Sequence, residues 1–219
     1  MLALLLLLSC QSTAEKPEDA IANEIAAVLV LSEDMVNREM SVDREAIADL
    51  IPSSYSCYEK FVPMYSVYKE QYASSLSSIV VSVLDSPDDI IRSEASVLSA
   101  NPGRFIESDT SLSSELRSQC YDRVRSCLFD ELEARRDDLE RAFAPSFDEF
   151  ESIRLAYLNL LSSGYRGEIP ENAGMVDIED LAEYAAECYF VSLEDAERTL
   201  KNRPLSEASD PIYTVFWGS

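Results

Sequence analysis

Four cysteines in the body of the chain are the residues best suited to covalent or metal chemistry: Cys57, Cys120, Cys127 and Cys188. Cys120 and Cys127 are seven residues apart on one expected helix. The helical rise separates them by about 10 Å, beyond the roughly 7 Å Cα limit for a disulfide, so each would have to pair with Cys57 or Cys188. The favoured alternative is four free thiols that pack as small apolar side chains, because the chain is long enough to fold without disulfides. A thiolate metal site is disfavoured because no CxxC spacing occurs.

Two further candidate sites lie on one tyrosine-rich segment. Ser66 and Lys69 match the SxxK pattern of the penicillin-interactive serine enzymes, in which lysine activates serine. Those enzymes also need SxN and KTG elements, which this sequence lacks, so we interpret the match as chance. Tyr65, Tyr68 and Tyr72 are candidates for the lining of a ligand groove, although their spacing favours a stripe that packs between helices.

A third candidate is the acidic set Asp130, Glu133 and Asp137, which would share one helical face and offer carboxylates to a cation. Arginines lie among these acids, and two acid–arginine pairs have the four-residue spacing of helical salt bridges: Glu131 with Arg135, and Asp137 with Arg141. The favoured interpretation is therefore a solvated charged face and no metal site.

These residues lie on segments whose apolar residues recur every three to four positions, which is typical of helices with one buried face. No segment alternates convincingly like a strand. The sequence therefore predicts an all-α fold, a single-domain bundle of about six or seven helices over residues 17–219. The expected helices have these approximate limits: Pro17 to Met40, Ser41 to Pro52, Pro63 to Val83, Pro87 to Leu98, Leu112 to Pro145, Ser146 to Gly164, and Asp177 to Pro204.

The limits rest on local signals. Ser41, Ser86 and Asp177 are expected N-caps, and Ser146 with Glu149 has the spacing of a capping box. Gly164 is expected to end its helix in a left-handed conformation.

Three larger features follow from the same pattern. The segment from Pro63 is expected to be the central helix of the bundle. The longest helix should carry a buried stripe every four residues from Leu112 to Leu132, and Pro145 should end it. Asn101-Pro102-Gly103 is expected to turn the chain, 165–176 to form an irregular loop, and the apolar tail 212–217 to dock on the bundle.

Composition removes several classes of function. The 41 acidic residues against 18 basic ones give a net charge of −23, so nucleic acid is not an expected partner. The absence of histidine excludes Ser-His-Asp and Cys-His catalysts and HExxH zinc sites. None of the five glycines falls in a GxGxxG or GxxxxGK[ST] pattern, so no phosphate-binding loop of these kinds is present. We therefore expect no cofactor.

The leucine run from Leu2 to Leu8 is far shorter than the roughly 20 residues that cross a bilayer as a helix. It ends in Leu7-Leu8-Ser9-Cys10, which resembles the lipobox of bacterial lipoproteins. The resemblance implies a signal peptide over 1–9, a lipidated tether over 10–16, and Cys10 as a mature N-terminus that carries acyl chains. The implied location is the bacterial cell envelope, lipid-anchored and facing the periplasm or the exterior. An ordinary cleaved signal and a buried N-terminal segment remain as alternatives.

A second resemblance lies at the other end of the chain. It rests on these residues: Asp180, Leu181, Tyr184, Cys188, Tyr189, Phe190, Glu194, Asp195, Arg198, Asn202, Pro204, Val215 and Phe216. They resemble the C-terminal part of an uncharacterised all-helical bacterial envelope family. The resemblance implies a helical fold and transfers no site.

Two functions are consistent with these observations. The favoured one is a non-catalytic envelope lipoprotein whose bundle binds a protein partner or an apolar ligand, with the lipid anchor as its contact to the membrane. The alternative is a periplasmic hydrolase that uses a carboxylate acid/base pair, which needs two carboxyl groups about 5 to 10 Å apart in a cleft.

Overall fold

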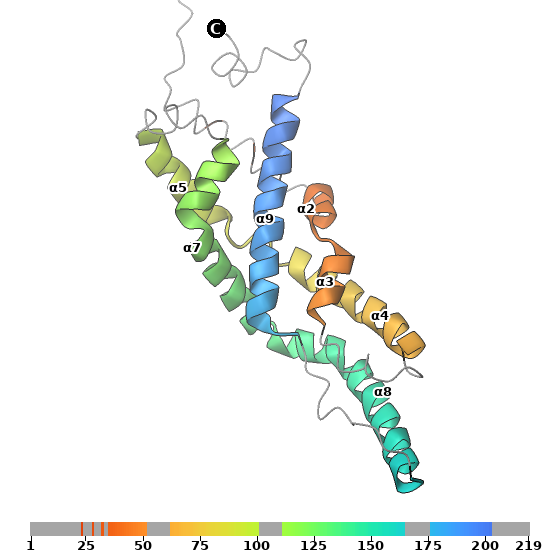
Figure 1. The fold of residues 1–219 in the computed structure, drawn as a ribbon. Helices are drawn as coiled ribbons and strands as arrows, with labels where there is room; N and C mark the ends of the chain where they lie inside the picture. Colours follow the sequence, from red (N-terminus) through yellow and green to blue (C-terminus); the bar gives the residue numbers. More distant parts are fainter. Residues whose placement is uncertain are drawn as a thin grey trace, which may run out of the picture.

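The computed structural model describes residues 23, 28, 32, 35–51, 62–100, 111–164 and 176–202. Over these residues the chain forms seven helices and no strand, packed as one bundle, which confirms the predicted fold class (Figure 1). The helices are α2 (Met35–Ser41), α3 (Arg44–Leu50), α4 (Val62–Val81), α5 (Asp88–Ala100), α7 (Leu112–Ala134), α8 (Arg136–Ser162) and α9 (Ile178–Lys201). The leader with Cys10, the tether, Asn101-Pro102-Gly103, the loop 165–175 and the tail 212–217 lie outside the described residues.

Helix α9, and not α4 as the sequence pattern suggested, lies at the centre of the bundle. It packs against α7, α2 and α3, and Figure 1 shows it between α7 and the α2–α3 pair. Its buried residues include Ala182, Ala185, Ala186 and Ala196, whose small side chains let neighbouring helices approach on more than one side. Val191, three residues after the buried Cys188, is by contrast 39% exposed. The reason is that the buried face runs through residues on the opposite side of the helix, Tyr189 and Leu193 among them.

Helix α7 confirms the predicted stripe at four-residue steps. Its buried residues are Leu112, Ser113, Leu116, Cys120, Val124, Leu128 and Leu132. The helix begins at Ser111, whose hydroxyl accepts a hydrogen bond from the backbone N–H of Ser114.

The predicted end of this helix at Pro145 is wrong. The helix stops at Ala134, because Arg135 leaves the helical conformation with φ −100° and ψ 17°. Helix α8 then runs through Pro145, so Ser146 and Glu149 lie inside a helix and form no capping box. A proline inside a helix removes one hydrogen bond and bends the helix without having to end it, and α8 changes direction along its length (Figure 1).

Local capping interactions define three further helix ends. Asp177 caps α9 by accepting from the N–H of Glu179, and Gly164 closes α8 with φ 95°, as predicted. The cap of α3 is Asp43 and not Ser41, because the extended backbone at Asp43 lets its carboxylate accept from the N–H of Glu45 at 2.8 Å.

The interruption between α4 and α5 also occurs where it was predicted, and it covers residues 82–87. Asp88 and Asp89 place two acidic residues in the first turn of α5. Pro87 precedes the helix, however, and its carbonyl accepts from the N–H of Ile91 at 3.2 Å, so Pro87 and not Ser86 stands at the cap position.

Candidate functional site

Arg38 on α2 is the most buried basic residue that the structure describes, with 2% of its surface exposed. Its Nε donates to the carbonyl of Ser32 at 2.6 Å. Nη1 donates to the carbonyl of Leu84 and to Oδ1 of Asp85, the latter at 2.6 Å. Nη2 donates to both carboxylate oxygens of Asp88, at 3.0 and 3.1 Å. All three nitrogens of the guanidinium group therefore donate to acceptors.

Tyr189 extends this network to the central helix. Its hydroxyl donates to Oδ1 of Asp88 at 2.8 Å, and the guanidinium carbon of Arg38 lies 5.6 Å from the centre of its ring. Burial, together with the negative charge of Asp88, raises the pKa of Tyr189 well above its usual value. We call Arg38, Asp85, Asp88 and Tyr189 the Arg38 cluster. It joins α2, the start of α5 and α9, so its polar groups hold helices together.

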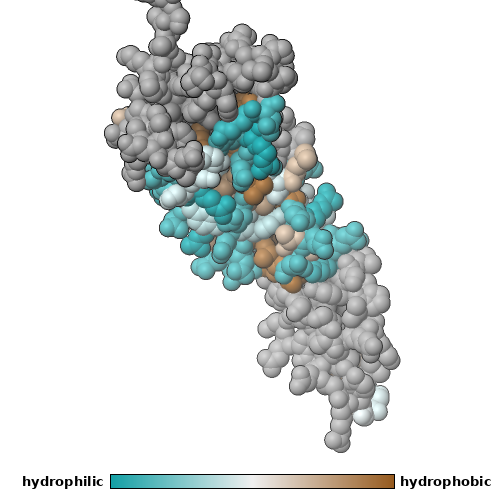
Figure 2. Space-filling view, turned by 45° about the horizontal axis from the view of Figure 1, so that its top comes forward, coloured by the Kyte–Doolittle hydropathy of each residue, from teal (hydrophilic) through white to brown (hydrophobic). Residues whose placement is uncertain are grey.

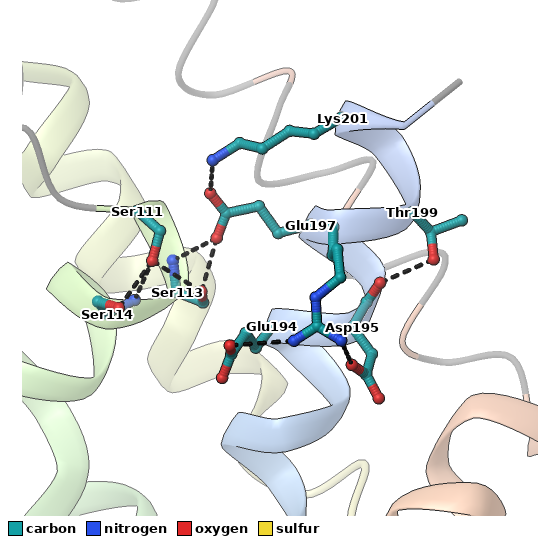
Figure 3. Close-up of polar contacts among 9 residues, drawn as sticks. Ser111, Ser113, Ser114, Glu194, Asp195, Glu197, Thr199 and Lys201 are labelled. Atoms are coloured by element: carbon teal, nitrogen blue, oxygen red, sulfur yellow. Dashed lines mark hydrogen bonds and ion pairs between the residues drawn. The ribbon is translucent and has the colours of Figure 1, made fainter. Parts of the chain in front are cut away.

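Glu197 forms a second buried polar junction, about two turns after Tyr189 and near the C-terminal end of α9 (Figure 3). Its side chain is 2% exposed and reaches the N-terminus of α7. Oε1 accepts from the N–H of Leu112 at 3.1 Å and from Lys201. Oε2 accepts from the N–H and the hydroxyl of Ser113, at 2.9 and 2.6 Å. The carboxylate thus caps α7 from a neighbouring helix, where the positive end of the helix dipole favours negative charge.

The pKa of Glu197 shows which form the site stabilises. Burial alone would raise this pKa, but the hydrogen bonds from Lys201 and Ser113 and the charge of Lys201 lower it. The site therefore holds the ionised form. By contrast, Arg198 pairs with Glu194 and Asp195 on the exposed side of the same helix (Figure 3), where ion pairs contribute little to stability.

A third polar junction lies between α7 and α9 and combines charged groups with aromatic rings. The hydroxyl of Tyr121 donates to Oε1 of Glu187 at 2.9 Å, and Arg117 pairs with the same carboxylate. The Arg117 guanidinium lies 5.5 Å from the ring centre of Tyr121 and 5.8 Å from that of Phe190. Burial and the hydrogen bond to Glu187 raise the pKa of Tyr121 to about 12, so this phenol stays protonated at neutral pH.

Three of the four body cysteines are described, and all three are free thiols; Cys57 lies outside the described residues. Cys120 and Cys188 are buried, and the thiol of Cys120 donates to the carbonyl of Leu116 at 3.0 Å. Burial is the main cause that raises the pKa of each of these two thiols to about 11. Cys127 is partly exposed, and burial together with Glu131 raises its pKa as well.

These environments predict an order of thiol reactivity. We expect iodoacetamide at about pH 8 to modify Cys127 before Cys120 and Cys188, because alkylation needs an accessible thiolate. Peptide mass mapping over time measures the order, and the same protein in urea is the control, in which the three rates should converge. Faster modification of either buried cysteine in the folded protein would contradict the described packing.

The tyrosine candidates are only partly described. Tyr72 is buried in the hydrophobic core, as packing between helices predicts. The side chains of Tyr65, Tyr68 and Ser66 lie outside the described ones, so a groove at the first two stays a prediction. Nζ of Lys69 lies 3.0 Å from Oδ1 of Asp49, which gives it a carboxylate partner.

The acidic candidates form the charged face that their spacing favoured. Glu131 pairs with Arg135 at 2.7 Å, as predicted, and Glu133 pairs with Arg136 at 2.7 Å. Arg141 pairs with Asp138 and not with Asp137, whose backbone carbonyl it contacts instead. Within the described ranges, no group of three or more Cys, Asp or Glu side chains is arranged to hold a metal ion.

The sequence reasoning missed both Arg38 and Glu197. A signal for Glu197 was present, because it stands four residues after Leu193 and three before Leu200, on the buried stripe of its helix. The spacing of Arg38 also placed it on a buried stripe, three residues after Met35 and four before Val42, but its charge made burial unexpected.

Comparison with known proteins identifies no relative: no family model, curated protein or solved structure matches this chain. Of the helices that the structure describes, none combines the length and the hydrophobicity needed to span a bilayer.

Proposed function

We propose that this protein is a lipid-anchored protein of the bacterial cell envelope whose helical bundle is a non-catalytic module that binds a protein partner. The observation that carries the proposal is the sequence Leu7-Leu8-Ser9-Cys10, with its resemblance to a lipobox. Each buried methylene of an acyl chain contributes about 0.8 kcal/mol to membrane binding, so several chains on Cys10 would hold the protein stably.

The surface of the bundle supports an acyl anchor as the membrane contact. Figure 2 shows a mainly hydrophilic surface over the described helices on this face, with small, separated hydrophobic areas. The net charge of −23 repels anionic lipid head groups. Attachment through Cys10 therefore leaves the acidic bundle free to meet a partner beside the membrane.

The two acids that are buried in the described part of the chain, Asp88 and Glu197, support binding over catalysis. An acid/base hydrolase needs one carboxyl group with a raised pKa and a second one facing it across a cleft. Asp88 is held by Arg38 and Tyr189, and Glu197 has a lowered pKa and four hydrogen-bond donors. Both carboxylates are thus engaged in joining helices.

The substitution Cys10→Ala tests the anchor. We expect wild-type protein in the membrane fraction and the variant in the soluble fraction, because alanine cannot carry a thioether-linked lipid. Intact mass spectrometry should show acyl mass on the wild type only. Cys57→Ala is the matched control, which removes a cysteine elsewhere and should remain membrane-bound. Unchanged fractionation of the Cys10 variant would refute the proposal.

A further inference from the structure

A pocket of about 380 Å³ lies between α2, α3 and α4. This volume is within the range of small-molecule sites, about 300–1,000 Å³. Seven of its eight lining residues are polar, namely three serines, two arginines and two acids. Arg38 and Asp85 of this wall already bind each other, which leaves Glu39, Arg44 and the serines to meet a ligand.

Arg44 and Glu39 are charged groups with no ion-pair partner among the described residues, and both side chains are exposed. An unpaired arginine stands out in a chain with 41 acidic residues and 18 basic ones. Its planar guanidinium group is suited to bind a carboxylate through two parallel hydrogen bonds. The pocket wall thus offers one free positive and one free negative group.

Ser77 supplies a second, independent observation. It is 6% exposed, lines the pocket, and makes no hydrogen bond within the described part of the chain. Its neighbours Ser78 and Ser82 instead donate to backbone carbonyls of their own segment. A nearly buried hydroxyl normally has a partner, so the hydroxyl of Ser77 is available to a ligand in the pocket.

The net charge of the protein favours a zwitterionic ligand over a purely anionic one. A purely anionic ligand would be attracted by Arg44 but repelled by the net charge of −23 and by Glu39. A zwitterion carries no net charge and can use both free groups. We propose that this pocket binds a small zwitterion of the α-amino acid type, with its carboxylate on Arg44, its ammonium group on Glu39 and a hydrogen bond to Ser77. This inference does not depend on the lipid anchor.

Calorimetric titration of the purified full-length protein tests the site. The zwitterionic probes are glycine, L-alanine and L-serine. Acetate and methylammonium each carry only one of the two charges of a zwitterion, and inorganic phosphate is a purely anionic probe. We expect at least one zwitterion to bind about tenfold or more tightly than any of the singly charged probes or phosphate. Diglycine distinguishes a free amino acid from a short peptide, since both carry a carboxylate and an ammonium group. Tighter binding of diglycine than of glycine would show that the site recognises a peptide.

Paired variants locate the bound groups. Arg44→Gln should weaken zwitterion binding by about tenfold to a hundredfold, the usual effect of losing a charged hydrogen-bonding partner. Ser77→Ala should also weaken it. The matched controls Arg125→Gln and Ser75→Ala change the same residue types outside the pocket and should bind as the wild type does.

Glu39→Gln separates a zwitterion site from an anion site. Loss of this carboxylate should weaken zwitterion binding, because the ammonium group loses its partner. In an anion site the same change would strengthen binding, because it removes a repulsive charge. Stronger binding in this variant, equal binding of acetate or phosphate, or no binding of any amino acid or of diglycine at about 10 mM would each overturn the proposal.

Discussion

The substitution Arg38→Met should lower the free energy of unfolding by about 3–5 kcal/mol, the usual cost of breaking a buried ion pair from one side. Methionine fills a similar length, but it leaves the carboxylate of Asp88 without its two guanidinium hydrogen bonds. The carbonyls of Ser32 and Leu84 also lose their donor. Urea unfolding followed by circular dichroism measures the loss, which is a large part of the stability of an ordinary domain.

Two further variants show whether the buried pair causes this loss. Asp85→Asn should cost at most about 1 kcal/mol, because the Asp85 side chain is 78% exposed and water can replace Arg38. The double variant Arg38→Met with Asp88→Asn should lose less free energy of unfolding than the sum of the two single variants, by about 1 kcal/mol or more. The reason is that Asp88→Asn removes the charge that Arg38→Met leaves unpaired. A loss below about 1 kcal/mol for Arg38→Met alone would show that the Arg38 cluster does not hold α2, α5 and α9 together.

Substitution of Glu197 should give the second largest effect and a distinctive pH dependence. Glu197→Ala should cost about 3 kcal/mol at neutral pH, because the N–H groups of Leu112 and Ser113 and the Ser113 hydroxyl lose their acceptor in a buried place. Glu197→Gln keeps the shape and some acceptor capacity, so about 1–2 kcal/mol is expected.

The pH dependence follows from the direction of the pKa change. The folded pKa of Glu197 is lowered, so the unfolded chain, with a pKa of about 4.3, takes up the proton more readily. The stabilisation by the ionised carboxylate is therefore fully present above about pH 4.3 and is lost as the pH falls through the lower folded pKa. The difference between wild type and Glu197→Gln should shrink over this acid range. Glu194→Gln, an exposed change on the same helix, is the control, and a difference that grows toward low pH would contradict the lowered pKa.

Local features of this fold could be predicted because each depends on neighbours in the sequence. The stripe from Leu112 to Leu132 reports which face of α7 is buried, whatever packs against it. The cap at Asp177 and the left-handed Gly164 depend only on the adjacent turn. The true end of α7 also left a local trace, because the four-residue step fails between Leu132 and the next buried leucine, Leu139.

The pairing of distant segments could not be predicted in the same way. Arg38 lies 50 residues from Asp88, and Glu197 lies 84 residues from Ser113. Periodicity shows that a side chain faces inward but not which helix it meets. The centre of the bundle was misplaced for the same reason, since the alanines of α9 look like weak core residues until several helices are known to crowd around them.

The position of α9 has a consequence for how the protein is made. The last described helix in the chain is the common neighbour of α2, α3 and α7, so the earlier segments emerge from the ribosome before the surface they pack against exists. Folding of this bundle should therefore be completed only after α9 has been synthesised. Such a delay would keep the chain unfolded during export, which the proposed location in the cell envelope requires.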